Sequence, residues 1–312
     1  MSATLRFGTA GWSFPDWGGI VYPKPRPRGF DPLSFLSEYL DTIEINSSFY
    51  RPPSEKDSCV WLNKIEARPE FRFSVKLWQG FTHEQEPFGA DEVKRFRKGV
   101  DILLEAGRLG AILIQFPWAF KNTDESRKRL DAVVSAFSDY PLVLEVRHSS
   151  WNNEEFYESL RESGVGFVNI DQPVFSRSIK PSGKATAPVG YVRLHGRNYE
   201  NWFSESEGSL GHASRDARYD YLYSIEELNP WAQNIKALER DCREVYIIAN
   251  NHFQGKAVVN ALELKQSSTG EKIKVPATLL ARYPRLKRIA KEESRRETYQ
   301  PDLFCSDSAS NR

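Results

Sequence analysis

The sequence predicts an α/β protein built as a single (β/α)8 barrel of the TIM type. Eight short apolar runs recur along the 312 residues, and longer segments with helical spacing separate many of them. Eight such units fit a chain slightly longer than the ~250 residues typical of this barrel. An open doubly wound sheet is the alternative, but no glycine-rich dinucleotide fingerprint follows the first run.

The eight runs are rich in β-branched and aromatic residues, which is typical of strands. In chain order they cover residues 5–11, 42–46, 71–76, 111–116, 142–147, 166–171, 191–196 and 245–250. Helical spacing is clearest in residues 91–107, 125–137, 153–164 and 224–241. Continuous apolar strands indicate a parallel sheet that is buried on both faces, so helices are expected to cover its outside.

Two segments depart from the repeating unit. The proline-rich stretch 22–32 is expected to run extended over the surface, because proline interrupts helices. Residues 197–224, after the seventh run, form a long polar connection with aromatic flanks, which is typical of a binding loop. We therefore predict one domain over residues 1–290, including a C-terminal extension after the last barrel helix, and a disordered tail over residues 291–312.

The composition narrows the classes of partner. Lys and Arg total 43 against 42 for Asp and Glu, so any anion site must be local rather than global. No run of eighteen apolar residues is present, which argues against a membrane span. The three cysteines stand far apart, without the spacing of a zinc site or a disulfide framework. The sequence thus predicts a cytoplasmic protein with no contact to a membrane, and it implies no protein partner.

Polar side chains occur at the predicted carboxyl ends of the strands, where TIM-type barrels carry their catalytic residues. The candidate catalytic residues are Glu44, Lys76, Glu145 and His195. The candidate substrate-binding residues are Trp12, Asn46, Tyr50, His83, Gln115, Arg147, Trp151, Asp171, Arg193, Asn250 and Asn251. An interior Glu–Arg pair can be purely structural, but buried charges cost several kcal/mol unless they are paired. So many polar strand ends therefore indicate a ligand or catalytic site.

Several motifs, in the same order, resemble the YecE-like family, also catalogued as domain of unknown function 72. They include GTAGWSFPDW, FSVKLWQGFTHE, LIQFPWAF, LEVRHSSW, YVRLHGRN and NNHFQGKAVVNALEL. The likeness runs from about residue 6 to about residue 266 and implies a TIM-type barrel. It implies no activity. The family pattern falls on most of the candidate residues given above and, in addition, on Gly8, Gly11, Trp17, Phe49, Thr82, Pro117 and Gly196.

Two functions fit the cluster of strand-end residues. The first is an enzyme acting on an anionic, phosphate-bearing substrate, such as a nucleic acid or a sugar, by hydrolase or isomerase-type chemistry. Arg147, Arg193 and Lys76 would hold the anion. Glu44 or Glu145 would act as acid or base, and His195 would move a proton. The alternative is a non-catalytic binder of single-stranded nucleic acid or a nucleotide, through phosphate contacts and base stacking.

The sequence leaves the cofactor open. A metal would recruit Glu44, Glu145, Asp171 and His195. The chain has only five histidines, without HxH or HExxH spacing, so a metal is not favoured. Two metal-free options remain. Lys76 could form a Schiff base if burial beside arginines lowers its pKa, or Glu44 and Glu145 could be the carboxyl pair of a glycosidase.

Overall fold

Eight parallel strands close into a barrel in the computed structural model, which describes residues 2–84, 86–200, 202 and 217–297. The strands are β1 (Thr4–Ala10), β2 (Thr42–Ile45), β3 (Arg72–Lys76), β4 (Leu109–Gln115), β5 (Leu142–Glu145), β6 (Gly166–Asp171), β7 (Val189–Leu194) and β8 (Glu244–Ala249). Each strand pairs with the next, and β8 pairs with β1. The predicted (β/α)8 barrel is confirmed.

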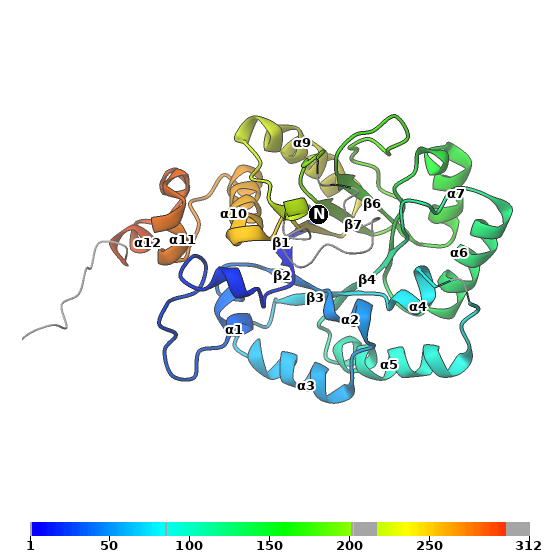
Figure 1. Ribbon diagram of the computed structural model, residues 1–312, viewed down its shortest axis with the longest axis horizontal. Coiled ribbons are helices and arrows are strands. Elements are labelled where there is room, and N and C mark those ends of the chain that lie inside the picture. The colour runs from blue at the N-terminus through cyan, green and yellow to red at the C-terminus, as the bar shows by residue number, and fades with distance from the viewer. Residues whose placement is uncertain (1, 85, 201, 203–216, 298–312) are drawn as a thin grey trace, which may run out of the picture.

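Helices surround the strands, as Figure 1 shows. The α-helices are α1 (Pro32–Leu36), α2 (Ser47–Tyr50), α3 (Glu55–Lys64), α4 (Gln79–Thr82), α5 (Ala90–Glu105), α6 (Asp124–Ala136), α7 (Glu154–Glu162), α9 (Ile225–Asp241), α10 (Lys256–Thr269), α11 (Ala277–Arg282) and α12 (Glu292–Glu297). The short 3-10 helices are η1 (Pro15–Trp17), η2 (Ser149–Trp151), η4 (Phe253–Gly255) and η5 (Pro284–Arg288). Several helices start at a polar cap; Ser54, Thr123, Asn153 and Ser224 each accept a hydrogen bond from a backbone N–H of the first turn.

The strands are apolar on both faces because their side chains alternate between two cores. Outward-facing residues such as Ile43, Ile45, Phe73 and Val75 pack in the large core between barrel and helices. Inward-facing residues form a smaller core inside the barrel, made of Ala10, Ala111, Leu113, Val143, Val168, Ile170, Tyr191, Tyr246 and Ile248. Charged side chains replace this inner core at the carboxyl ends of the strands.

The proline-rich connection runs over the surface, as expected. Residues 24–29 are exposed. The connection ends at Asp31, whose carboxylate accepts a hydrogen bond from the backbone N–H of Ser34 at 2.9 Å and so starts α1. The predicted binding loop is described only at its two ends, because residues 201 and 203–216 lie outside the described residues.

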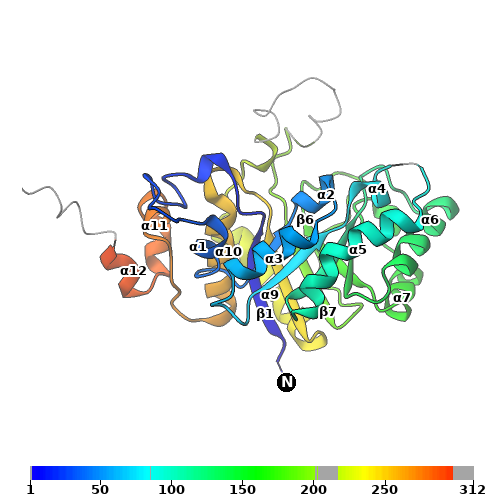
Figure 2. The ribbon, with the colours of Figure 1, turned by 90° about the horizontal axis from the view of Figure 1, so that it is seen from below.

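The C-terminal extension packs against the barrel domain beside α10 (Figures 1 and 2). Leu279, Leu280 and Leu286 of α11 and η5 are buried in the outer core. The chain remains helical into the segment predicted to be disordered, since α12 lies there. Its Ser294 is buried and its hydroxyl accepts a hydrogen bond from the backbone N–H of Val275 at 3.0 Å. Residues 298–312 lie outside the described residues.

None of the described helices is both long enough and apolar enough to span a membrane.

Candidate active site at the barrel mouth

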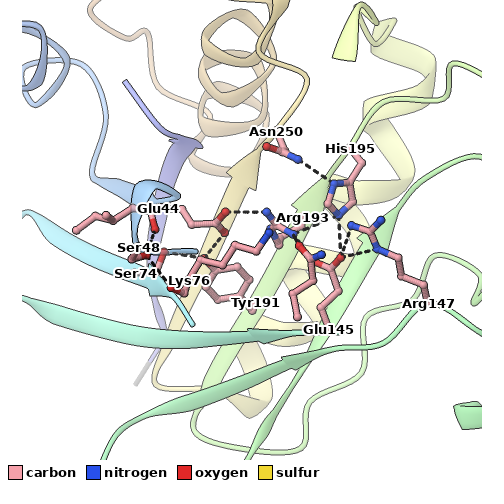
Figure 3. A network of polar contacts seen from close by, with 12 residues as sticks. Glu44, Ser48, Ser74, Lys76, Glu145, Arg147, Tyr191, Arg193, His195 and Asn250 are labelled. Carbon is pink, nitrogen blue, oxygen red and sulfur yellow. Dashed lines mark hydrogen bonds and ion pairs between the residues drawn. The ribbon is translucent and has the colours of Figure 1, made fainter. Parts of the chain in front are cut away.

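A network of charged and polar side chains fills the mouth of the barrel, above the apolar inner core (Figure 3). Its members come from the ends of the strands or the residues just after them: Glu44, Lys76, Gln115, Glu145, Arg147, Arg193, His195 and Asn250. Each occupies an inward position, because side chains alternate along a strand. The structure therefore brings all of these candidate residues together.

Arg193 is the centre of this network. Its Nη2 donates to Oε1 of Glu44 at 2.7 Å, and its Nη1 donates to Oε2 of Glu145 at 2.5 Å. Nη1 also donates to Oε1 of Gln115 at 3.1 Å. The Arg193 side chain is 1% exposed, and both carboxylates are 0% exposed. Burial of these three charges is tolerated because each is paired and hydrogen-bonded.

The second oxygen of Glu44 is occupied as well. The Tyr191 hydroxyl donates to Oε2 of Glu44 at 2.9 Å, and the Ser74 hydroxyl lies 2.7 Å from that of Tyr191. Burial, followed by repulsion from Glu44, raises the pKa of Tyr191 well above its usual range. Tyr191 therefore stays a neutral donor, and it holds Glu44 in place from below.

Glu145 also accepts bonds at both of its oxygens. Arg147 donates from Nε to Oε1 of Glu145 at 2.8 Å, and its Nη2 lies 2.8 Å from the same oxygen. Burial alone would raise the pKa of Glu145, but the positive charges of Arg193 and Arg147 hold it well below its usual range. Glu145 is thus a fixed anion at neutral pH, and as placed it is not a proton donor.

His195 is fully buried beside Glu145. Its Nδ1 accepts from the side-chain amide of Asn250 at 3.0 Å, and its Nε2 lies 3.3 Å from Oε1 of Glu145. Burial lowers the pKa of His195 to about 3, and repulsion from Arg193 contributes. The imidazole is neutral at pH 7 and directs its Nε2–H toward Glu145. This environment does not suit the role of proton carrier near neutral pH that the sequence suggested.

Lys76 differs from the other charged members because its amine has no ionic partner among the residues that the structure describes. Its Nζ makes no hydrogen bond or ion pair with any residue that the structure describes, and lies 4.0 Å from the centroid of the Phe49 ring. Glu44 and Glu145 attract the amine, but their oxygens already accept bonds from other groups. Burial, followed by repulsion from Arg193, lowers the pKa of Lys76 to about 7. Lys76 as a whole residue is partly exposed.

Replacing Lys76 by Met is expected to stabilise the protein at pH 6 and to have less effect at pH 9.5. The lowered pKa means that, between pH 7 and about 10.4, the unfolded chain binds a proton that the folded chain does not. The stability of the unmodified protein therefore rises with pH across this window, and the variant lacks that rise. Urea unfolding at both pH values measures the difference. The exposed Lys98 of α5, changed to Met, is the control and should show no such pH dependence. An equal effect of Lys76→Met at both pH values would contradict the prediction.

Asp171 does not belong to the mouth, although the sequence placed it there. It ends β6 with its side chain on the outer face, because the neighbouring Ile170 points inward. Arg197 binds both carboxylate oxygens, at 2.8 and 2.7 Å. The Tyr223 hydroxyl and the Trp231 indole donate to Asp171 at 2.9 and 2.5 Å. Asp171 thus ties α9 and the segment after β7 to the barrel.

Two further candidates are structural by position. Trp151 is 1% exposed, stacks on Phe120 in the outer core, and donates from Nε1 to the carbonyl oxygen of that residue at 2.8 Å. Asn251 is buried on the outer side of the barrel and donates to the Tyr221 carbonyl and the Asn260 side chain, at 2.7 and 2.8 Å. Neither side chain belongs to the charged network.

The remaining candidates lie around the network rather than in it. Tyr50 is 68% exposed, and the ring centroids of His83 and Phe49 lie 4.8 Å apart with the two rings nearly perpendicular. Trp12 is partly exposed and packs edge-on against Trp61. Asn46 follows β2, and its Oδ1 is buried without a hydrogen-bond partner among the described residues. These four side chains lie outside the charged network defined above.

The four residues of the metal hypothesis are not gathered in the structure. Asp171 lies outside the barrel, and both ring nitrogens of His195 are engaged by Asn250 and Glu145. Within the described part of the chain, no three Asp, Glu, His or Cys side chains are placed to hold a metal ion. The donor set therefore does not fit a bound metal.

The family pattern described as "Protein of unknown function DUF72" matches residues 6–284, which is most of the chain. The chain belongs to the DUF72 family. It is 28% identical over 272 residues to UPF0759 protein YunF of Bacillus subtilis, covering 83% of this chain and 93% of that protein.

Two solved DUF72 structures are similar to this chain. TM1631 from Thermotoga maritima is 33% identical, with a TM-score of 0.72 over 84% of this chain and 98% of that one. EF0366 from Enterococcus faecalis is 24% identical, with a TM-score of 0.71 over 85% of this chain and 95% of that one, and shows the shared fold. Both likenesses agree with the closed barrel described above.

Sequence reasoning missed several residues at the mouth of this barrel. Tyr191 and Ser74 support the network from inward positions two residues before Arg193 and Lys76, and strand alternation could have identified them. Trp202 also lies at the mouth, with its ring near Arg147 and His195, at 5.7 and 6.1 Å. Only its aromatic character marked it in the sequence. Its position over Arg147 depends on the path of the chain after β7.

Proposed function

We propose that this DUF72 protein is an enzyme that binds an anionic substrate, carrying a phosphate or a carboxylate, at the mouth of the barrel. The proposal rests on two positively charged groups, one on Lys76 and one on Arg147, that still have N–H donors available for a ligand. The amine of Lys76 and Nη1 of Arg147 make no hydrogen bond with any described residue. Guanidinium and ammonium groups of this kind bind phosphate and carboxylate oxygens through charge-assisted hydrogen bonds.

The balance of charge at the mouth supports the same proposal. Two carboxylates, Glu44 and Glu145, stand against Arg147, Arg193 and Lys76. Arg193 bridges both carboxylates, and Arg147 adds a second positive charge beside Glu145. Lys76 then leaves one excess positive charge whenever its amine is protonated. A bound anion would neutralise this charge in a setting where few water molecules compete.

Lys76 is the candidate best suited to act on the substrate. Glu44, Glu145 and His195 are completely enclosed and bonded to other side chains. Lys76 is partly exposed, and its pKa of about 7 allows it to gain or lose a proton at physiological pH. The buried carboxylates are then a fixed frame that positions the guanidinium groups of Arg147 and Arg193.

Calorimetric titration with inorganic phosphate and with glucose 6-phosphate, at low salt, tests the anion site. We expect binding that weakens by about 10- to 100-fold in Arg147→Gln and in Lys76→Met, because each variant loses a charge-assisted hydrogen bond. The controls Arg161→Gln on α7 and Lys98→Met on α5 change exposed residues and should bind like the unmodified protein. Equal binding by all five proteins, or no binding by the unmodified protein, would contradict the anion site.

Turnover distinguishes the enzyme from its alternative, a binder of single-stranded nucleic acid or a nucleotide. The exposed rings of Tyr50 and Tyr199, in segments after β2 and β7, give that alternative a stacking surface. Each bound anion is followed by NMR for chemical conversion, which Lys76→Met should abolish. Binding of oligonucleotides that falls steeply with salt, without conversion of any ligand, would favour the binder.

A further inference from the structure

We propose that Lys76 forms a Schiff base with the substrate, and that the substrate is therefore an aldehyde or ketone carrying a phosphate or carboxylate. This inference rests on the proposed function and deepens it, because it names the reactive group of the substrate and the atom of the protein that bonds to it.

The position of the amine is the first support. Lys76 ends β3, and its backbone carbonyl accepts a hydrogen bond from the Ser48 hydroxyl at 2.6 Å, which holds the end of the strand. The amine stands over the Phe49 ring at 4.0 Å, and Lys76 as a whole residue is partly exposed. A nucleophile needs a defined position, and the end of β3 together with the Phe49 ring defines the position of the Lys76 amine.

The arrangement around the amine is the second support. The oxygens of Glu44 and Glu145 already accept bonds from Arg193, Tyr191 and Arg147. Neither carboxylate forms an ion pair with the Lys76 amine within the described part of the chain. A lysine left unpaired in a buried network is costly as a structural element, whereas a reactive amine requires this condition.

The surrounding charges determine how often the amine is neutral. Burial is the largest effect on the pKa of Lys76, and the repulsion of Arg193 and Arg147 acts in the same direction. Glu44 and Glu145 oppose it without restoring the ordinary value, and the pKa is about 7. His83 packs against the same Phe49 ring as Lys76. Burial lowers the pKa of His83 to about 4, so this side chain adds no positive charge at pH 7. Near neutral pH about half of the Lys76 amines are free to attack a carbonyl.

The reaction balances without an oxidant or a metal. The neutral amine attacks the carbonyl carbon, a C–N bond forms, and a proton moves from nitrogen to oxygen to give a carbinolamine. Loss of the C–O bond releases water, which carries away the carbonyl oxygen and both amine protons, and leaves the C=N bond of the imine. Arg147, with its unused Nη1, is placed to bind the anionic group of the same substrate.

Borohydride trapping tests the inference. The unmodified protein is incubated with dihydroxyacetone phosphate or with pyruvate, reduced with sodium borohydride, and mapped by peptide mass spectrometry. We expect a stable secondary amine on Lys76, at about tenfold or more the level on the exposed Lys98. Labelling should fall as pH drops below 7, decrease in the presence of inorganic phosphate, and weaken in Arg147→Gln. Lys76→Arg removes the labelled position, and Lys98→Met is the matched control that should keep it.

The outcomes separate this inference from the proposed function. Phosphate binding in the calorimeter without label on Lys76 would overturn the Schiff base and leave the anion site standing. Equal labelling by uncharged hydroxyacetone would overturn the anionic class of substrate. Absence of both phosphate binding and label would overturn both proposals. Each of these measurements is made on the unmodified protein, so none of them depends on whether a variant folds.

Discussion

Replacing Glu145 by Ala is expected to lower the free energy of unfolding by about 3–5 kcal/mol, among the largest effects of any single substitution at the mouth. The carboxylate is 0% exposed and accepts bonds from both Arg193 and Arg147. Its removal leaves Arg147 without an ionic partner among the described residues and leaves Arg193 with Glu44 alone. Urea unfolding followed by circular dichroism, at pH 7, measures the loss.

A surface substitution of the same kind is the matched control. Glu155 of α7 pairs with Arg127, and its side chain is 76% exposed. Glu155→Ala should cost about 1 kcal/mol or less, because water replaces the lost partner. Glu145→Gln keeps the shape of the side chain and some of its acceptors, so an intermediate loss is expected. A similar small loss for Glu145→Ala and Glu155→Ala would show that the buried network does not depend on the charge of Glu145.

Replacing Arg193 by Met is expected to destabilise the protein by about 3–5 kcal/mol at pH 7, and by less at pH 4. The substitution leaves Glu44 with Tyr191 as its remaining hydrogen-bond donor, while Glu145 keeps Arg147. Two buried carboxylates with one arginine are expected to retain a proton. A carboxyl whose pKa is raised on folding contributes stability at low pH and loses it as the pH rises.

The stability of the unmodified protein depends on pH in the opposite direction, so the two proteins are easily distinguished. The pKa of Glu145 is depressed in the folded state, so its contribution is present above about pH 4.3 and is lost as the pH falls toward the folded value. The stability difference between the two proteins should therefore grow from pH 4 to pH 7, as measured by urea unfolding at each pH. Arg161→Met, at an exposed pair on α7, should show no such growth. A constant difference would mean that the two carboxylates stay ionised without Arg193.

The two expected losses have a common physical basis. The charges in the network compensate one another. A buried network of this kind seldom stabilises a folded protein more than well-packed apolar side chains of similar volume would. Stability alone is therefore a poor explanation for the network of Glu44, Glu145, Arg147 and Arg193. This network holds the guanidinium groups of Arg147 and Arg193 at defined positions, which is the purpose that the proposed function gives it.

Much of the fold could be predicted from the sequence, because the period of the apolar pattern is a local property. Eight apolar runs and the helical segments between them gave the barrel and its strands to within a few residues. The strand ends gave Glu44, Glu145 and Arg193 as a converging group, since parallel strands present their carboxyl ends on one side. The local pattern of apolar residues could not predict where α12 packs. Its position depends on a hydrogen bond between Ser294 and Val275, which is distant in the sequence.

The sequence by itself determined which residues share a face of each strand, and only the closed barrel decided which face points inward. In β6 both faces are apolar or uncharged except at Asp171, so the alternation cannot tell that Ile170 faces the interior and Asp171 faces α9. The partners were decided in the same way. The sequence placed Glu145 and Arg147 on the same face of one strand and left their partners open, and the barrel brings Arg193 across the mouth to both carboxylates. Within the described part of the chain Lys76 forms no ion pair, whereas the planar guanidinium of Arg193 bridges both carboxylates at once.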